Sequence, residues 1–322
     1  MKPGSIFRSD GFSNACKGPG SANSMEETVR ICVILNPAAR GARLWSESLE
    51  REVRSVGVVQ RTQKPGEAWA LAAAAAREGF DVVVAAGGDG TVHEVLNGLA
   101  EVPDALERVR LGVLPLGTAN VLARELALPH RPWEAWQRLE AGRERRWDLG
   151  WAKWRGTHGA ERRYFAQLGG AGLDARAIER VAPNWKARLG PWAYVWAGWR
   201  AVWTAPDRLE WDCGAERLEG ELILVGNGRL YGGPFVLFPE AVPDDGLLDV
   251  CVFPRVTIWR VLLCGPWLLI RGRVPERMVL RRRVSQFRLT GAQSVPFELD
   301  GELVGRIPAE FGVIPKGLCL VG

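Results

Sequence analysis

The sequence predicts an α/β domain with a mostly parallel sheet, followed by a mainly antiparallel β domain with helical insertions. Up to about residue 146, short apolar runs alternate with helical patterns, and this order favours a parallel sheet covered by helices on both faces. From residue 147 onward, strand-like runs separated by Gly, Pro and Asp turns dominate, which indicates antiparallel pairing. The chain has 322 residues, enough for two such domains.

We expect the first domain over residues 28–146 and the second over 147–322, with the last strand a candidate to return to the first domain. Residues 1–27 are rich in Gly, Ser and Asn, which predicts a disordered tail, and Met25 is an alternative start. The strands expected in the first domain are 30–35, 58–62, 82–86 and 110–114, and the helices are 43–56, 67–78, 92–100, 121–126 and 133–141. The second domain is expected to hold strands at 147–154, 163–168, 221–225, 248–253, 287–290, 295–299 and 318–321, with helical insertions near 187–203 and 257–272.

The segment 81–100 is the most informative part of the chain. An apolar run ends in Gly87-Gly88-Asp89-Gly90-Thr91, and a helical pattern follows directly. A strand, a glycine turn and a helix start together offer backbone N–H groups and a positive helix end to a phosphate. An acid in such a turn repels a bare phosphate, so Asp89 indicates a divalent cation that binds both groups. The alternative is a tight turn with an aspartate cap.

Two other loops follow the same logic. Residues 36–41 and 115–120 also come after an expected strand and before an expected helix. In a parallel sheet such loops meet at the carboxyl edge, where these folds bind ligands. The three loops together predict a nucleotide crevice, which Thr62 joins from the end of another strand. Glu94 either reaches a ribose or a cation there, or places a favourable charge in the first helical turn.

Composition excludes several other kinds of site. The chain has 6 Cys without a CxxC pair and only 3 His, which argues against a disulfide framework and a histidine metal cluster. The cysteines are expected to be reduced residues of a cytoplasmic protein. No P-loop pattern is present. Gly170, Gly172 and Ala175 match a dinucleotide fingerprint only loosely, and a strand-end turn is the preferred interpretation.

The chain resembles the diacylglycerol kinase catalytic family, which also includes sphingosine and ceramide kinases and bacterial lipid kinases. The matching segments come in the family's order: NPAARG (36–41), GGDGTVHEVLNGL (87–99), PLGTANVLAREL (115–126), NGRLYGGPFVLFPEAVPDDGLLDV (227–250) and FELDGE (297–302). NAD kinases and phosphofructokinases share the GGDGT element, so the resemblance implies a first domain of their fold. The full combination of motifs is more specific to the lipid kinases.

The resemblance implies ATP and Mg²⁺ as cofactors and assigns roles to individual residues. Asp300 would be the general base for a lipid hydroxyl, with Glu302 beside it on the metal–phosphate side. Asp89 would act on the catalytic Mg²⁺. Asp245, with the carbonyl groups of Val242 and Leu247, matches a structural Mg²⁺ loop of bacterial members. The residues implied to hold ATP are Asn36, Pro37, Ala38, Ala39, Arg40, Thr62, Gly87, Gly88, Asp89, Gly90, Thr91, Val92, His93, Glu94, Gly117, Thr118 and Asn120.

Two departures from the family pattern bear on activity. Val121 stands where many members have Asp, and His93 stands where many have Asn. Loss of the acid at 121 removes one contact from the metal network. The sequence therefore predicts an ATP- and Mg²⁺-dependent kinase of a membrane-lipid hydroxyl, such as that of diacylglycerol, a sphingoid base or ceramide. The alternatives are a catalytically weak homologue that binds nucleotide or lipid, and a kinase of a water-soluble substrate such as NAD.

Tryptophan and arginine indicate a contact with anionic membrane. Residues 185, 192, 196, 199 and 203 are all Trp at helical spacing, and basic residues accompany a second insertion that carries Trp259 and Trp267. This pattern predicts a cytoplasmic protein peripherally bound to membrane, whereas core burial explains the Trp stripe equally well. For the arginines at 271, 273, 277 and 281–283 we favour the membrane. No nucleic-acid module is recognised, and no oligomeric state is predicted.

Overall fold

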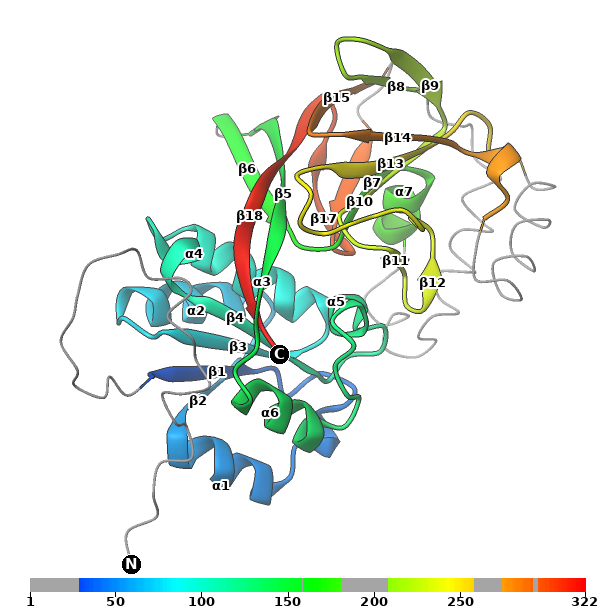
Figure 1. Cartoon of the computed structure of the whole chain (residues 1–322). Coiled ribbons are helices and arrows are strands. Elements are labelled where there is room, and N and C mark those ends of the chain that lie inside the picture. Colours follow the sequence, from blue (N-terminus) through cyan, green and yellow to red (C-terminus); the bar gives the residue numbers. More distant parts are fainter. Residues whose placement is uncertain (1–28, 158, 181–207, 258–273, 292–294) are drawn as a thin grey trace, which may run out of the picture. The chain divides into compact units, whose positions relative to one another are not determined.

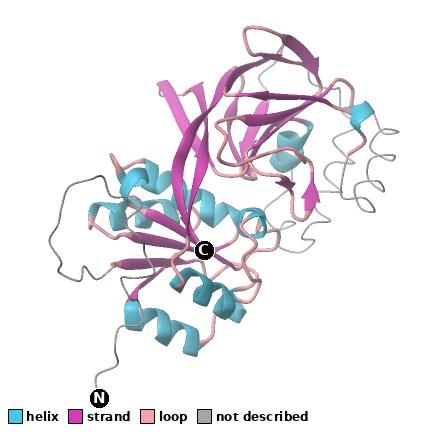
Figure 2. Ribbon diagram, viewed as in Figure 1, coloured by secondary structure: helices cyan, strands magenta, loops and turns pink. Residues whose placement is uncertain are grey.

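The computed structural model describes residues 29–157, 159–180, 208–257, 274–291 and 295–322 (Figure 1). It contains two compact units, one formed by the chain up to Trp147 together with Lys316–Gly322, the other by Asp148–Pro315. Helices and parallel strands build the first unit, and antiparallel strands dominate the second (Figure 2). The fold class predicted from the sequence is confirmed. Both predicted helical insertions fall almost entirely outside the described residues.

A parallel sheet forms the centre of the first unit. Its strand order is β2-β1-β3-β4-β18, and each neighbouring pair is parallel. Every residue of β1 and β3 is buried, as expected for strands covered by helices on both faces. The bounds are β1 Ile31–Leu35, β2 Gly57–Arg61, β3 Val82–Gly87, β4 Arg110–Pro115 and β18 Ala309–Val321, whose last residues pair with β4.

Helices cover both faces of this sheet (Figure 1). Side chains of α1 and α6 join one face in a core that includes Leu49 and Trp136. On the other, α2 and α3 approach so closely that a Cβ at Gly98 would lie 2.2 Å from the Trp69 carbonyl oxygen. The bounds are α1 Glu47–Val56, α2 Glu67–Arg77, α3 Asp89–Ala100, α4 Ala105–Arg108, α5 Val121–Glu125 and α6 Pro132–Glu140.

The helix expected over 43–56 is interrupted. A short 3-10 turn, Ala42–Leu44, comes first, and α1 begins only at Glu47. Ser46 causes the restart, because its hydroxyl accepts a hydrogen bond from Leu49 N at 3.2 Å and caps the helix. The four-residue helix α4 was not expected from the sequence, since it is too short to show a period.

The second unit contains a six-stranded antiparallel sheet of order β14-β13-β10-β7-β16-β17. Strands β15, β8 and β9 follow β18 in the larger, ten-stranded sheet, and β5 pairs with β18 and β6. Aromatic residues of both sheets fill the core, where the Phe287 and Phe311 rings stack at 5.1 Å. The bounds are β5 Glu144–Gly156, β6 Gly159–Phe165, β7 Leu168–Gly172, α7 Leu173–Arg180, β8 Leu209–Asp212, β9 Arg217–Gly220, β10 Leu222–Gly226, β11 Leu230–Tyr231, β12 Phe235–Val236, β13 Leu248–Phe253, β14 Leu280–Val284, β15 Gln286–Gly291, β16 Pro296–Leu299 and β17 Glu302–Arg306.

One strand expected over 163–168 is in fact the junction of two strands, β6 and β7. The break falls at Ala166 and Gln167, whose N–H groups donate to the Asp300 carboxylate. The expectation of a strand-end turn at Gly170–Gly172 is also imprecise. These residues form the end of β7 itself, and Gly172, at φ +98°, leads directly into α7.

Within the described ranges, no helix has the length and apolar character needed to span a bilayer. Cys32, Cys251 and Cys319 are buried cysteines outside any disulfide, and Cys213 is half-buried. Burial raises the pKa of Cys32 and of Cys251 to about 12. Such thiols are packing residues rather than nucleophiles.

Candidate functional site

The three predicted loops of the first unit lie at the carboxyl edge of its parallel sheet and are joined through their backbones. Leu116 N donates to Gly87 O at 2.8 Å, and Gly41 N donates to Leu116 O at 2.7 Å. A Cβ at Gly117 would lie only 2.4 Å from Gly88 Cα. Glycine is therefore required here because two backbones touch.

Two asparagines close these loops. Asn36 donates from Nδ2 to Thr91 Oγ1 at 3.1 Å, and its Oδ1 accepts from Ala38 N at 2.9 Å. Asn120 accepts from Gly117 N at 2.8 Å and donates to Gly117 O at 2.9 Å. Its φ of +49° is a conformation that Asn tolerates better than most residues. Asn120 therefore holds its own loop in shape, and Asn36 also ties its loop to the start of α3.

The start of helix α3 is the element best suited to an anion. Gly88 occupies its N-cap position and makes no side-chain cap, so the first N–H groups of this twelve-residue helix point out of its amino end. Asp89 lies at that end, and its Oδ1 accepts a hydrogen bond from Val121 N at 2.6 Å. Position 121, where many family members are expected to carry an acid, here supplies only its backbone N–H to Asp89.

Other residues predicted to hold ATP have structural partners. Glu94 accepts from Gly66 N at 3.0 Å and from Ala68 N at 3.1 Å, so it caps α2. Val92 and His93 are buried in α3, and Thr62 is buried at the end of β2. The exposed members of the predicted set are Pro37, Ala38, Arg40 and Thr118.

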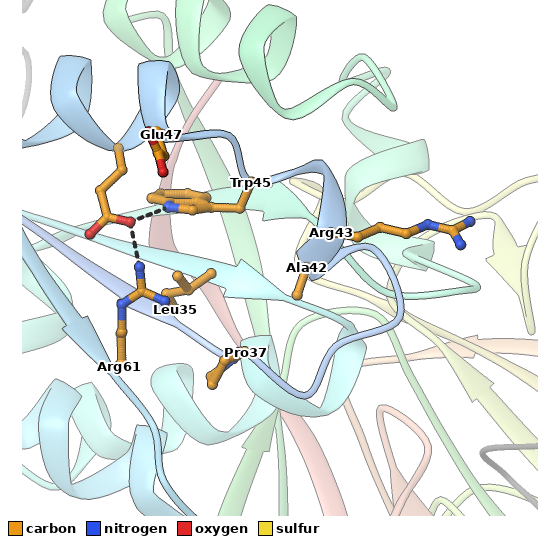
Figure 3. A pocket seen from close by; sticks show the side chains of 8 residues that line it. Leu35, Pro37, Ala42, Arg43, Trp45, Glu47 and Arg61 are labelled. Atoms are coloured by element: carbon orange, nitrogen blue, oxygen red, sulfur yellow. Dashed lines mark hydrogen bonds and ion pairs between the residues drawn. The ribbon is translucent and has the colours of Figure 1, made fainter.

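A cavity of about 410 Å³ borders the loop at Pro37. Trp45 and Arg61 converge on one carboxylate, that of Glu50, and Arg43 extends away from them (Figure 3). Burial opposes the charge of Glu50, but the hydrogen bond from Trp45 and the neighbouring arginines together lower its pKa. The lining residues are Leu35, Pro37, Ala42, Arg43, Trp45, Glu47, Glu50 and Arg61.

In the second unit, Asp300 is held by the backbone between β6 and β7. Its Oδ2 accepts from Ala166 N and its Oδ1 from Gln167 N and Leu168 N, each at 3.0 Å. Its backbone has φ +50°, and Gly301 follows at +85°. Glu302 is exposed at the start of β17. The aspartate is therefore fixed in direction by contacts more than 130 residues away in sequence.

Sequence reasoning missed residues that support this turn. Glu298 is buried within the FELDGE motif, and its Oε2 accepts from Gly301 N at 2.6 Å. Asn227 is also buried, and its Nδ2 donates to Asp148 O at 2.7 Å and Ala166 O at 2.8 Å. Both lie in segments that carry the resemblance, but no pattern marks them as buried.

In the predicted structural metal loop, Asp245 is paired with an arginine from strand β14. Asp245 accepts from Leu247 N at 3.0 Å and forms an ion pair with Arg283. Arg283 Nε also lies 3.4 Å from Asp249 Oδ2. Burial raises the pKa of Asp249 to about 6, although Arg283 opposes this. A Mg²⁺ ion at Asp245 would share the carboxylate with Arg283, and the side chain of Val242 is exposed beside it.

The arginines of β14 have partners within the protein. Arg281 donates to Leu237 O at 2.6 Å, and Arg282 forms a two-pronged contact with Glu216 at 2.6 Å. These contacts stabilise the second unit, and they leave membrane binding by these arginines a prediction. The tryptophans at 185–203 and those at 259 and 267 lie outside the described residues, so membrane binding through them stays a prediction.

Comparisons with known proteins cover nearly the whole chain. Residues 30–152 match the family model described as diacylglycerol kinase catalytic domain, and residues 169–322 match the YegS C-terminal NAD kinase beta sandwich-like domain. A diacylglycerol kinase of Staphylococcus aureus (strain bovine RF122 / ET3-1) is 29% identical over 256 residues, which are 78% of this chain and 77% of the relative. A probable lipid kinase YegS-like protein of Enterobacter sp. (strain 638) is 29% identical over 294 residues, 89% of this chain and 93% of the relative.

A solved structure shows the same fold. The crystal structure of a diacylglycerol kinase from Bacillus anthracis str. Sterne aligns with a TM-score of 0.70 and 20% identity. The alignment covers 92% of this chain and 98% of that chain. At this identity the likeness supports the fold alone.

Proposed function

The chain belongs to the diacylglycerol kinase catalytic family of lipid kinases, and from this premise we propose that it transfers phosphate from Mg·ATP to a hydroxyl group of a membrane lipid. The observation that carries the proposal is the joined set of loops at the carboxyl edge of the first unit. Their touching glycines and the uncapped start of α3 form the kind of cradle in which backbone N–H groups bind phosphates.

The residues of the cradle fit a magnesium ion. Mg²⁺ is usually bound through one or two carboxylates together with substrate phosphates and water, and Asp89 supplies one carboxylate beside the phosphate cradle. When bound, the ion would neutralise the charge of the phosphates. Asn36 and Thr91 would keep the first loop against α3 while the nucleotide binds.

Asp300 would accept the proton of the lipid hydroxyl. Phosphoryl transfer asks the protein mainly for positioning and charge stabilisation, with one residue to orient the nucleophile. The three N–H groups of residues 166–168 support this role because they fix the direction of the carboxylate. Glu302, exposed two residues later, would lie on the phosphate side.

We infer a cytoplasmic protein that acts at the membrane surface, because its substrate is a lipid. The net charge of +5 supports attraction to anionic lipid. A catalytically weak homologue is the second candidate function. Val121 favours it, because the position supplies a backbone N–H to Asp89 but no second carboxylate.

The test is transfer of labelled γ-phosphate from Mg·ATP to vesicles that contain diacylglycerol, sphingosine, ceramide or phosphatidylglycerol. Asp300→Asn should lower lipid labelling by about 100-fold or more, as expected for loss of a general base. Asp104→Asn, a change at an exposed aspartate outside every predicted site, is the matched control and should label lipid like the wild type.

Since Asp300 also holds backbone groups, thermal unfolding and ATP binding of the variant must be measured alongside. A wild-type protein that binds ATP but labels none of these lipids would favour the weak homologue. Labelling that persists in a folded Asp300→Asn variant would exclude Asp300 as the base.

A further inference from the structure

Two acids that have no assigned part in the reaction face each other beside β7. Glu298 of β16 is fully buried, and Asp174 lies half-buried in the first turn of α7. Glu298 is paired across the sheet with Gly170. A Cβ at position 170 would lie 3.1 Å from Glu298 Oε1 and 3.2 Å from Asp174 Oδ2. The two carboxyl groups therefore border one space, which exists because residue 170 is glycine.

The surroundings of this space disfavour two negative charges. Burial is the main cause that raises the pKa of Glu298 well above its ordinary range, followed by the charge of Asp174. The other charged groups that act on Glu298 are also acids, Asp300 and Glu302. Burial raises the pKa of Asp174 to about 6, against a hydrogen bond from Tyr231. Like-charged carboxyl groups in one desolvated site usually retain a proton.

Hydrogen bonding places that proton. Glu298 Oε2 accepts from Gly301 N at 2.6 Å, whereas its buried Oε1 has no hydrogen-bond partner. A proton on Oε1 would make this oxygen a donor, which could hydrogen-bond to the carboxylate of Asp174.

The same glutamate is hydrogen-bonded to the turn that follows Asp300. Asp300 and Gly301 both have positive φ, at +50° and +85°. For a non-glycine residue this conformation persists only where the surroundings enforce it. The bond from Gly301 N to Glu298 closes the turn on one side, while residues 166–168 hold the Asp300 carboxylate on the other.

We propose that Glu298 and Asp174 share one proton above Gly170, and that this acid pair is a positioning device for the Asp300 turn. Tyr231 of β11 fixes the outer acid, and Glu298 fixes the turn. The catalytic part of the proposal rests on the proposed role of Asp300, but the shared proton does not.

The shared proton is tested by the pH dependence of stability in the full chain, with Glu298→Gln as the variant. Glutamine has the shape of the protonated acid and keeps an acceptor for Gly301 N. A raised folded pKa means that the folded wild type binds more protons than the unfolded chain above about pH 4.5, so its stability falls as pH rises. Between pH 5 and 8 the unfolding constant of the wild type should increase relative to Glu298→Gln, by up to tenfold for each pH unit.

Glu276→Gln, at an exposed glutamate of the same unit, is the matched control and should follow the wild type. Parallel profiles for the wild type and Glu298→Gln would overturn the shared proton. Stabilisation of the wild type, but not of Glu298→Gln, by added Mg²⁺ or K⁺ at pH 8 would replace the proton with a cation and would also overturn it. Infrared spectroscopy should show the carbonyl band of a buried protonated acid, which is lost in Glu298→Gln.

The positioning role is tested by kinetics of lipid phosphorylation. Glu298→Ala should lower kcat at least tenfold with an unchanged KM for ATP, and Glu298→Gln should restore most of the loss at pH 7. Equal kcat for wild type and a folded Glu298→Ala variant would overturn the positioning role. If the wild type phosphorylates no lipid, the proposed function fails, and the stability profiles still decide whether the proton is shared.

Discussion

The loops of the first unit and the turn of the second unit at Asp300-Gly301-Glu302, called here the acid turn, are stabilised by different contacts. The three loops of the first unit are held by contacts between their backbones and by two asparagines, Asn120 within its own loop and Asn36 across to Thr91. The acid turn is held by residues far away in sequence, since Asp300 binds the N–H groups of 166–168. The loops of the first unit follow strands of one parallel sheet and are brought together by it, whereas the turn at Asp300 depends on contacts with a segment more than 130 residues away.

The largest effect is expected from breaking the long-range support of the acid turn. Asn227→Ala leaves the buried carbonyl groups of Asp148 and Ala166 without their donor, which should cost about 2–4 kcal/mol of unfolding free energy. Lipid phosphorylation should fall, while ATP binding to the first unit is retained. Denaturant unfolding and calorimetric ATP titration measure the two effects.

Asn227→Asp is the matched variant, because it keeps the shape of the side chain and removes both N–H donors. It should be at least as destabilising as Asn227→Ala. Wild-type stability in either variant would show that the segment at 166–168 does not depend on Asn227.

A second change separates the touching loops of the first unit. Gly117→Ala places a Cβ 2.4 Å from Gly88 Cα and 2.7 Å from Asn120 Oδ1, so the loops must separate. Overpacking of this kind should cost about 1–3 kcal/mol and should abolish tight ATP binding. Ala119→Ser, in the same loop but outside the predicted ATP-binding set, leaves the spacing of Gly88 and Gly117 intact and serves as the control. Unchanged ATP affinity in Gly117→Ala would contradict a role for the close approach.

A smaller effect is expected from adding a second carboxylate beside Asp89. Val121→Asp restores an acid beside Asp89 in a position that is 5% exposed. Without metal the added charge should destabilise the first unit, and with Mg²⁺ it should strengthen metal binding on the order of tenfold, or about 1.4 kcal/mol. Thermal unfolding with and without Mg²⁺ measures both. If Val121→Asn, which adds no charge, gains as much Mg²⁺ affinity, charge is not the cause.

The smallest effect is expected for a contact that supports neither the loops of the first unit nor the acid turn. Arg77 and Glu101 form an ion pair at 3.1 Å, with side chains 58% and 49% exposed. Arg77→Ala should change the unfolding free energy by less than about 1 kcal/mol, since exposed pairs are screened by water. ATP affinity and lipid phosphorylation should match the wild type. A larger change would mean that α2 and α3 contribute to the site through this contact.

Much of the first unit could be predicted from local patterns. Strands β1, β3 and β4 were expected to within one residue, because a short apolar run ends at a Gly, Pro or Asn in each case. The loop residues that touch could also be named, since glycines and asparagines after strands have few other uses. The capping role of Glu94 could only be left as one of two alternatives, because its partner lies on another helix.

The second unit was less predictable for a physical reason. Strand β18 runs over thirteen residues, but only its apolar end at 318–321 was expected, because its middle includes exposed Pro315 and Lys316. The break between β6 and β7 was missed, since it arises from hydrogen bonds to Asp300. Glu298 and Asp174 were missed because nothing in a sequence shows that two acids will face each other across a glycine.

The sequence by itself determined the order of strands and helices in the first unit and the positions of the three loops that follow its strands. These depend on backbone geometry and on side chains within a few residues of each other. Tertiary structure decided which polar groups are paired, which are buried and which retain a proton. Those properties depend on desolvation and on partners brought together from distant segments, and both exist only once the chain has folded.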